Sequence, residues 1–524
     1  QHDGHHEHHE LGFWRTYIFS TDHKVIGMQY GFCGLAFLFF GFCLIATMRW
    51  SMAYEGQAVP FVGPLLEALL GNNVAPGGVM SAELYNVFGA MHGTIMVFMG
   101  IVPAAFAAFG NYVVPLQIGA VDMAFPRVNM ASFWAFFFGC VIMMVSFFIP
   151  GGAAQAGWTS YSPLASIIPT DGQTYWLIGM IMLITSSLLG AVNFIATIIN
   201  LRAPGMTWLR MPFFVWAQFI TAFLLLLAFP PLEAAGILQL MDRVLETSFF
   251  LPTGLVVGGQ DVDVSGGGSP LLWQHLFWLF GHPEVYIIFL PAAGVISTVI
   301  PVMARTTLLG YGWIVAAAVS LGVLSFGLWV HHMFTTGLPS LSLGFFSAAS
   351  EAVVIPTGVQ LFAFVATLMV GRVKMILPML WIAGALAIFT AGGLTGIMVA
   401  VAPFDWQVHD TYFIVAHLHY TLFGGMIFPI IGGVYYFYPF ITKKKMSDRL
   451  GRWAFWLMFT GFNLCFLPMH VTGLQGMPRR VFTYPEELGW NALNMVSTIG
   501  AFVTAAGVIH LCDATLTECA TSPT

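Results

Sequence analysis

Long apolar segments recur along almost the whole chain, and they constrain its fold more than any other feature. Of the 524 residues, 58% are hydrophobic and only 8% are charged, whereas soluble domains are roughly 25% charged. A helix of about 20 apolar residues crosses a hydrocarbon core about 30 Å thick. The chain is therefore expected to be an all-α polytopic membrane protein.

Twelve segments are long and apolar enough to be expected as transmembrane helices. They lie near residues 26–48, 86–109, 130–150, 173–200, 211–231, 271–301, 311–333, 345–370, 375–400, 409–440, 453–473 and 490–513. An even number of crossings places both termini on one side of the membrane.

The positive charges indicate which side that is. Of the 17 lysines and arginines, only Arg49, Arg243, Arg479 and Arg480 fall on the side opposite the termini, and the other thirteen fall on the terminal side. Because cytoplasmic loops carry the excess of basic residues, both termini are predicted to be cytoplasmic.

The expected organisation is one membrane domain with two short tails. Residues 1–25 form a cytoplasmic N-terminal tail, residues 26–513 the twelve-helix domain, and residues 514–524 a cytoplasmic C-terminal tail. The tail begins QHDGHHEHHE, which is interpreted as solvated rather than as a defined metal site. The sequence shows no nucleotide-binding loop, no catalytic Ser/His/Asp arrangement and no nucleic-acid patch.

Six histidines lie inside these apolar segments or at their ends. A polar ring in hydrocarbon is costly unless something binds it. One intramembrane histidine is more often a satisfied core residue than a ligand. Along the expected topology, however, all six fall in the outer half of the bilayer, and we therefore interpret them as metal ligands. They are His92, His282, His331, His332, His417 and His419.

The spacing of these histidines limits which of them can share a metal ion. His417 and His419 are two residues apart on a helix, so they are separated by about 200° of rotation and point to opposite faces. One helix must therefore serve two centres. His331 and His332 are adjacent and could converge on one metal together with His282 from another span.

Several motifs resemble the catalytic subunit of the haem-copper oxidases, the subunit I family of cytochrome c oxidase. The motifs are WQHLFWLFGHPEVYI at 273–287, WVHHMFTTG at 329–337, HDTYFIVAHLHY at 409–420 and GMPRR at 476–480, with STDHKVIGMQY near the start and FGNYVVPLQIGAVDMAFPRVN at 109–129. The resemblance covers essentially the whole chain.

The resemblance implies the role of each histidine. His92 and His419 would be the axial ligands of a low-spin haem A. His417 would be the proximal ligand of a second, high-spin haem A that binds oxygen, and His282, His331 and His332 would hold a copper ion facing it. Tyr286 lies one helical turn after His282 and in the family is covalently bonded to that histidine.

The resemblance also implies two routes for protons. Glu284, a carboxyl group within a span, would end a pathway that starts at Asp122 on the cytoplasmic side. That pathway would pass Asn111, Asn129, Ser132, Ser187 and Asn193. The second would include Ser297 and Thr357, but this chain has Gln360 where the family normally has lysine. Glu351, nine residues before Gln360, would compensate for that lysine or lie at the membrane surface.

On the outer surface the resemblance implies contacts to the haem propionates and a magnesium site. Arg479, Arg480 and Trp158 match propionate neighbours, and Arg49 is expected to contact the low-spin haem. Asp410 is expected near a propionate and, with His409, as a ligand of Mg²⁺ at the interface with another subunit. An imidazole is an unusual ligand for that ion.

The function implied is that of subunit I of a terminal oxidase, which reduces O2 to water with electrons from cytochrome c and pumps protons. Quinol oxidase is the alternative within the family, and a secondary transporter is the alternative from another class. Expected partners are a copper-containing subunit II, subunit III, cytochrome c or another donor, and membrane lipid, with no nucleic acid. The expected location is a bacterial plasma membrane rather than a mitochondrial inner membrane.

Overall fold

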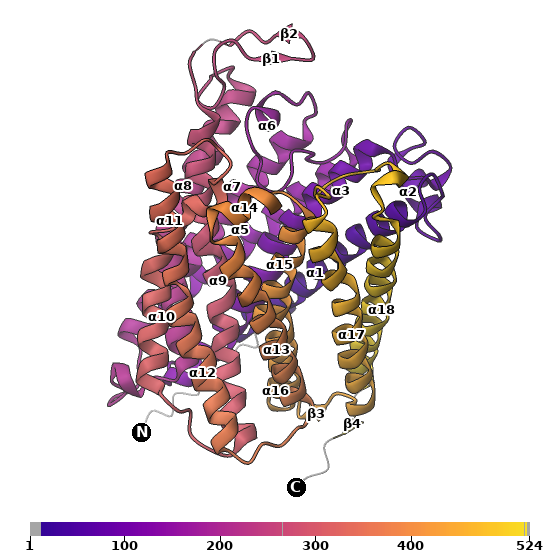
Figure 1. Ribbon diagram of the computed structural model, residues 1–524. Coiled ribbons are helices and arrows are strands. Elements are labelled where there is room, and N and C mark those ends of the chain that lie inside the picture. Colours follow the sequence, from indigo (N-terminus) through magenta and orange to yellow (C-terminus); the bar gives the residue numbers. More distant parts are fainter. Residues whose placement is uncertain (1–11, 265, 518, 521–524) are drawn as a thin grey trace.

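The structure is a computed structural model that describes residues 12–264, 266–517 and 519–520. Its long helices pack side by side as one bundle (Figure 1). Eleven of them are long and apolar enough to cross a membrane. The expectation of an all-α polytopic membrane protein is confirmed, while the role expected for the first ten residues lies outside the described part of the chain.

The eleven candidate spans follow the expected segments closely. They are His23–Ala53, Ala82–Ile118, Pro126–Phe148, Gly172–Asn200, Phe213–Val244, Pro270–Ala304, Ser340–Val370, Leu377–Val399, Tyr412–Thr442, Asp448–Leu474 and Asn491–Thr515.

Eight spans are built on one long α-helix each. These helices are α1 (His23–Ala53), α5 (Pro126–Val145), α7 (Gly172–Asn200), α8 (Phe213–Val244), α9 (Pro270–Ala304), α13 (Leu377–Val399), α17 (Asp448–Leu474) and α18 (Asn491–Leu516). Three further spans are joined from consecutive segments. They are α3 (Ala82–Thr94), η3 (Ile95–Ile101), η4 (Pro103–Ala108) and α4 (Phe109–Ile118); α11 (Ser340–Ala352) and α12 (Val354–Val370); and α15 (Tyr412–Leu422), η8 (Phe423–Ile427) and α16 (Phe428–Thr442).

The segment expected as the seventh span, 311–333, differs from a full-length helix. It consists of α10 (Tyr311–Ser325), which is 15 residues long, and the 3₁₀ segment η7 (Trp329–Met333). At 1.5 Å per residue α10 covers about 22 Å, less than the hydrocarbon core. A count of twelve transmembrane helices is therefore not confirmed, and the cytoplasmic side of the termini stays a prediction.

Short elements connect the spans. They are η1 (Trp14–Ile18), α2 (Gly63–Leu70), η2 (Pro76–Gly78), η5 (Ser146–Phe148), α6 (Leu164–Ile167), η6 (Trp208–Arg210), α14 (Ala402–Val408) and η9 (Glu486–Leu488), and the strands β1 (Val256–Val257), β2 (Gln260–Asp261), β3 (Lys444–Lys445) and β4 (Cys519–Ala520). The glycine-rich stretch after α8 forms the antiparallel hairpin β1–β2, which projects from one end of the bundle (Figure 1). Strand β3 pairs with β4 at the opposite end.

Wide π-helical turns interrupt the two helices that bear histidines 92, 417 and 419. Segments η3 and η4 follow His92, and η8 follows His419. Pro103 at the start of η4 has no N–H to donate. Gly424 in η8 lies so close to α13 that a Cβ there would be 2.3 Å from the backbone nitrogen of Phe389. Such π turns are often found at functional sites.

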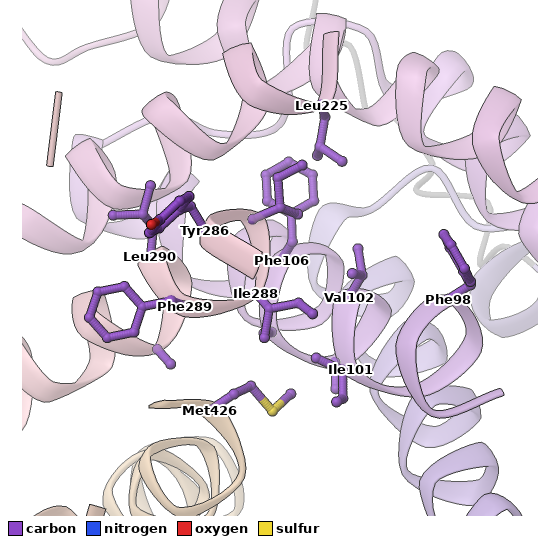
Figure 2. Close-up of a cluster of buried hydrophobic side chains, with 14 of the residues drawn as sticks. Phe98, Ile101, Val102, Phe106, Leu225, Tyr286, Ile288, Phe289, Leu290 and Met426 are labelled. Atoms are coloured by element: carbon purple, nitrogen blue, oxygen red, sulfur yellow. The ribbon is translucent and has the colours of Figure 1, made fainter. Parts of the chain in front are cut away.

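A buried apolar cluster fills the space between these spans at the level of the histidines. Figure 2 shows part of it, with Phe98, Val102 and Phe106 of the second span next to Tyr286 and Ile288 of α9. All five side chains are less than a tenth exposed. The cluster joins α9 to the second span and so fixes the helix that carries the GHPEVY motif.

Candidate functional site

Three histidines from two segments of the chain converge on one point. His282 comes from α9, while His331 and His332 come from η7, and their ligand atoms all lie within 4.8 Å of one another. Nδ1 of His282 is 3.1 Å from Nε2 of His331. Two nitrogens bound to one metal at about 2.0 Å each are about 3 Å apart when the bond angle is near 100°. The separation therefore fits a shared ion.

Neighbouring side chains determine how each ring is presented. The hydroxyl of Ser350 donates to the carbonyl of Phe346, at 2.6 Å, and is 2.8 Å from Nδ1 of His331. Because its only proton is used in that bond, the Ser350 hydroxyl accepts a hydrogen bond from Nδ1–H of His331. Nε2 of His331 therefore keeps a free lone pair. His332 lies flat against Trp278, with ring centroids 3.9 Å apart and planes 8° from parallel.

Two ring nitrogens of this cluster are buried without a hydrogen-bond partner. They are Nε2 of His282 and Nε2 of His332. Buried polar atoms in proteins nearly always have a partner. For His332 the free nitrogen fits a metal ligand. For His282, whose Nδ1 faces His331, the free nitrogen is on the other side of the ring, and the ring centroids of His282 and Tyr286 are 4.9 Å apart.

His92 of α3 and His419 of α15 form a second arrangement. Their ring centroids are 6.5 Å apart and their planes are within 6° of parallel. Nδ1 of His92 is 2.8 Å from the carbonyl of Gly41, and Nδ1 of His419 is 2.7 Å from that of Val415. Because both Nδ1 atoms donate to backbone, both Nε2 atoms carry a lone pair that is free to bind a metal.

The distance between these rings fits an ion coordinated from both sides. Two metal–nitrogen bonds of about 2.0 Å account for about 4 Å of the separation, and the ring atoms account for the rest. Direct ring stacking would bring the rings closer, as it does for His419 and Phe466 at 4.2 Å. The gap between His92 and His419 is therefore the width of an axially ligated metal.

His417 lies on the other face of α15 and contacts α13. Its Nδ1 is 3.0 Å from the hydroxyl of Thr395 and 3.1 Å from the carbonyl of Gly392. A Cβ at Gly396 would be 3.2 Å from Cε1 of His417, so a glycine there lets the ring lie close to α13. The sequence-based expectation that His417 and His419 serve different centres agrees with these contacts.

Trp158 lies between the three-histidine cluster and the pair formed by His92 and His419. Its side chain packs on Gly93, the neighbour of His92, where a Cβ would be 3.0 Å from the indole. Its ring also meets Trp278, which stacks on His332, with centroids 5.9 Å apart. The indole of Trp278 donates to the hydroxyl of Tyr161. Burial raises the pKa of Tyr161 to about 12, so that hydroxyl stays neutral at physiological pH.

The residues expected to contact propionates lie together in loops between the spans. Nε of Arg479 is 2.6 Å from a carboxylate oxygen of Asp410, and the Arg479 amide donates to the Asp410 carbonyl. Arg480 packs against Gly157, the residue before Trp158. Asp410 and Arg480 both have positive φ angles, 53° and 66°. Left-handed backbone at such residues is costly and clusters at functional sites.

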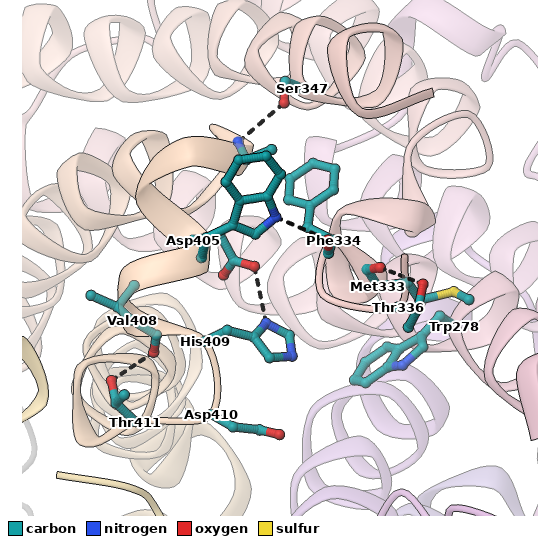
Figure 3. A network of polar contacts seen from close by, with 12 residues as sticks. Trp278, Met333, Phe334, Thr336, Ser347, Asp405, Val408, His409, Asp410 and Thr411 are labelled. Atoms are coloured by element: carbon teal, nitrogen blue, oxygen red, sulfur yellow. Dashed lines mark hydrogen bonds and ion pairs between the residues drawn. The ribbon is translucent and has the colours of Figure 1, made fainter. Parts of the chain in front are cut away.

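Asp405 is a site residue that the sequence interpretation missed. It is 4% exposed and accepts a hydrogen bond from Nδ1 of His409 at 2.9 Å, as Figure 3 shows. Burial lowers the pKa of His409, but the hydrogen bond and charge of Asp405 and the charge of Asp410 outweigh burial, and the pKa is raised. The signal in the sequence was the spacing of four residues, which places both side chains on one face.

Arg49 lies elsewhere, between α1 and α18. It is 4% exposed, and one of its terminal nitrogens donates to the Asn494 carbonyl at 2.8 Å and to the Thr498 hydroxyl at 2.9 Å. Its Nε is buried without a partner. A buried guanidinium held only by neutral groups is costly, and its free Nε could donate to one further acceptor.

Several residues of the first expected proton pathway take part in hydrogen bonds or line one cavity. Nδ2 of Asn129 donates to Oδ1 of Asn111 at 2.7 Å. The amide of Phe125, in the loop that carries Asp122, donates to Oδ1 of Asn193 at 2.9 Å. Farther along, Asn111, Ser132 and Ser187 line one internal cavity. Three further residues that the sequence interpretation missed take part: Tyr30, Ser186 and Thr197.

Glu284 of α9 is 2% exposed, and neither carboxyl oxygen has a hydrogen-bond partner. Phe280, one turn before it on α9, packs on Phe98 and Phe229, which line that same cavity. A carboxyl group in such surroundings is expensive to ionise. Phe280 thus connects the turn of α9 that carries Glu284 to the wall of the cavity, and Glu284 is a group that favours carrying a proton.

The residues of the second expected pathway are not linked. The hydroxyl of Ser297 donates to the carbonyl of Gly294 at 2.7 Å, and that of Thr357 to the carbonyl of Val353 at 3.0 Å. Gln360 is 1% exposed, and neither of its amide atoms has a partner.

Glu351 lies at the depth of the three-histidine cluster. It follows Ser350, which contacts His331, and is the twelfth residue of α11. Its Oε1 is buried and has no hydrogen-bond partner. The role expected for Glu351 stays a prediction.

Comparison with known proteins gives one family. The family model described as "Cytochrome C and Quinol oxidase polypeptide I" matches residues 25–503. Cytochrome c oxidase subunit 1 of Synechocystis sp. is 43% identical over 497 residues, which cover 95% of this chain and 84% of that protein. Quinol oxidase subunit 1 of Bacillus subtilis is 40% identical over 501 residues, which cover 95% of this chain and 72% of that protein.

A solved structure shares the fold. It is described as a heme-copper terminal oxidase dimer, and the match covers 96% of this chain and 84% of that chain. The TM-score is 0.77 at 19% sequence identity, so this likeness supports the arrangement of helices alone.

Proposed function

Because the chain belongs to the family of cytochrome c and quinol oxidase polypeptide I, we propose that it is the catalytic subunit of a respiratory terminal oxidase. The enzyme would reduce O2 to water with electrons from cytochrome c and couple this to proton pumping. One observation carries the proposal: two histidines face each other across the width of a metal, while a third on the opposite face of the same helix lies toward a three-histidine cluster.

The proposed cofactors are two haems A and one copper ion. When bound, they supply the electron transfer and O2 binding that side chains cannot. His92 and His419 would hold the low-spin haem through Nε2, and His417 the oxygen-binding haem. His282 would bind copper through Nδ1, and His331 and His332 through Nε2. The unpartnered Nε2 of His332 and the 3.1 Å between Nδ1 of His282 and Nε2 of His331 support this assignment.

Tyr286 is proposed to be bonded to His282 and to supply a proton and an electron for O–O cleavage. In support, Nε2 of His282 has no hydrogen-bond partner, and the two rings lie 4.9 Å apart on successive turns of α9. Both side chains are less than a tenth exposed, so water is kept from the reacting groups.

Protons are proposed to enter at Asp122 and to reach Glu284 through the cavity lined by Asn111, Ser132 and Ser187. The hydrogen bonds between Asn129 and Asn111 and between Phe125 and Asn193 support a continuous polar route. Ser297, Thr357 and Gln360 were expected to form a second route, for which the contacts offer less support.

The outer loops are proposed to hold the haem propionates and a magnesium ion. Arg479 and Arg480 would neutralise the propionates with Trp158 packed beside them, and Arg49 would contact the low-spin haem through its unpartnered Nε. His409 and Asp410 would bind Mg²⁺, with Asp405 orienting the imidazole.

The chain is proposed to work in a bacterial plasma membrane together with a copper-containing subunit II and a subunit III. In support, its spans are those of an integral membrane protein, and the relatives named above include bacterial subunits 1 of cytochrome c oxidase and quinol oxidase.

Oxygen consumption by the purified complex tests the proposal and its alternative. With reduced cytochrome c as donor, cyanide-sensitive O2 uptake at one O2 per four electrons is expected. Uptake with a quinol but not with cytochrome c would favour the quinol oxidase alternative, for which the B. subtilis relative is the specific observation. No uptake with either donor, in a preparation that contains haem and copper, would contradict the proposed function.

A further inference from the structure

The cavity on the Asp122 side has the properties of a water-filled passage. Its volume is about 30 Å³, and a water needs about 10–15 Å³ by the same measure. Its polar lining comes from Tyr30, Asn111, Ser132, Ser186 and Ser187. Water in this cavity therefore has both the space and the hydrogen-bond partners that ordered water requires.

The cavity beside Gln360 is different. Its volume is about 10 Å³, the lower limit for one water. Apart from Thr357 and Gln360, its lining consists of apolar side chains such as Phe289, Ile296 and Phe389 and the glycine Gly424. Since the hydroxyl of Thr357 already donates to backbone, Gln360 is the one unpaired polar group there. A single water can occupy this place, but a chain of waters cannot.

The helices that line the second cavity also carry no titratable side chain beyond Tyr286. The described residues of α9 beyond Tyr286, and all those of α12, η8 and α13, include no Asp, Glu, Lys, Arg, His or Cys. An amide side chain such as that of Gln360 cannot be protonated and passed through. Protons approaching Tyr286 from this side would meet an apolar barrier.

We propose that this oxidase takes up all protons for both halves of its reaction cycle through the single route that begins at Asp122. This inference rests on the proposed function. Electrons entering a buried site must be balanced by protons, because uncompensated charge in low dielectric is costly. With no second route, reduction of the metals depends on Asp122 just as oxidation by O2 does.

Anaerobic stopped-flow reduction of the whole purified complex tests the inference. The Asp122→Asn variant keeps the volume and the acceptor that the Met123 amide uses but loses the titrating group. Reduction of the oxygen-binding haem is expected to slow at least tenfold, while reduction of the low-spin haem keeps its rate. A pH indicator in the same mixing experiment should show proton uptake slowed in parallel.

Two further variants separate the routes. Asp513→Asn removes an exposed acid near the end of α18 and should change neither rate. Gln360→Leu removes the one unpaired polar group of the second cavity and should leave reduction of the oxygen-binding haem within twofold of the wild type.

Three results would overturn the single route: an unchanged reduction rate in Asp122→Asn, slowed reduction in Gln360→Leu, or reduction faster than the wild type in Gln360→Lys. The last would mean that the wild type lacks a route it needs. Failure of the proposed function looks different, because the wild-type complex would then show no haem that binds carbon monoxide, whatever the variants do.

Discussion

The rings of His92 and His419 face each other with centroids 6.5 Å apart and planes 6° from parallel, although the two residues are 327 positions apart in the chain. Each ring is oriented by one backbone carbonyl, that of Gly41 for His92 and that of Val415 for His419. Two helices thus hold a pair of lone pairs in the geometry of axial ligands before any metal is bound.

The first prediction separates the metal centres. His419→Ala should remove the low-spin haem and leave copper bound, whereas His332→Ala should lose copper and keep the low-spin spectrum, because the two residues belong to different arrangements. Visible spectra and copper analysis of the purified variants measure this. His510→Ala, whose ring meets only the carbonyl of Ala506, should keep both centres. Loss of the same single centre in both variants would contradict the assignment.

The second prediction concerns Ser350, which accepts from Nδ1–H of His331 at 2.8 Å. Ser350→Ala should weaken copper retention by about 10–100-fold, the usual effect of losing a group that orients a metal ligand. Copper content after dialysis against graded concentrations of chelator measures it. Ser320→Ala, which removes an exposed hydroxyl bonded only to Ala316, is the matched control. Equal copper retention in the two variants would show that Ser350 does not orient His331.

The third prediction concerns Glu284. Glu284→Gln should reduce steady-state O2 consumption at least a hundredfold while both haems remain, because glutamine keeps the volume but not the proton. An oxygen electrode and the haem spectrum of the same sample measure the two properties. Glu487→Gln, at an exposed position in an outer loop, should keep wild-type turnover. Wild-type turnover in Glu284→Gln would exclude the relay without affecting the haem assignment.

The fourth prediction concerns the close packing of η8 on α13. A methyl group at Gly424 would meet the backbone of Phe389 at 2.3 Å and of Ile388 at 2.9 Å. Backbone atoms cannot move aside as a flexible side chain can. Gly424→Ala should therefore destabilise the protein by about 1–3 kcal/mol or more. Gly393→Ala, with no atom within 4 Å of its new methyl group, should be neutral or slightly stabilising. The midpoints of thermal unfolding compare the two, and equal midpoints would contradict the packing argument.

The apolar pattern predicted the class of fold and most of the spans, because the bilayer requires about 20 apolar residues per crossing whatever the tertiary packing. The breaks inside the spans were not predictable in this way. The turns η3, η4 and η8 remain apolar in sequence, so hydropathy does not distinguish them from regular helix. Hydropathy could not predict the end of α10 at Ser325 for the same reason.

For the site, the spacing of His417 and His419 was enough to place them on opposite faces, since that follows from helical geometry alone. The orienting groups were not predictable, because Ser350, Thr395 and Trp278 contact their histidines only through tertiary packing. The roles of the Gly41 and Gly392 carbonyls cannot be predicted from the sequence, because every residue has a backbone carbonyl. Asp405 was the exception, because it lies one turn from His409.

Binding of carbon monoxide to the fully reduced protein tests the central claim most directly. His92 and His419 would occupy both axial positions of one haem, while His417 would leave one position of the other haem open. With two haems per chain, carbon monoxide should bind to one and leave the spectrum of the other unchanged, and His419→Ala should remove the haem that does not bind it. Binding to both haems, or to neither, would contradict the arrangement.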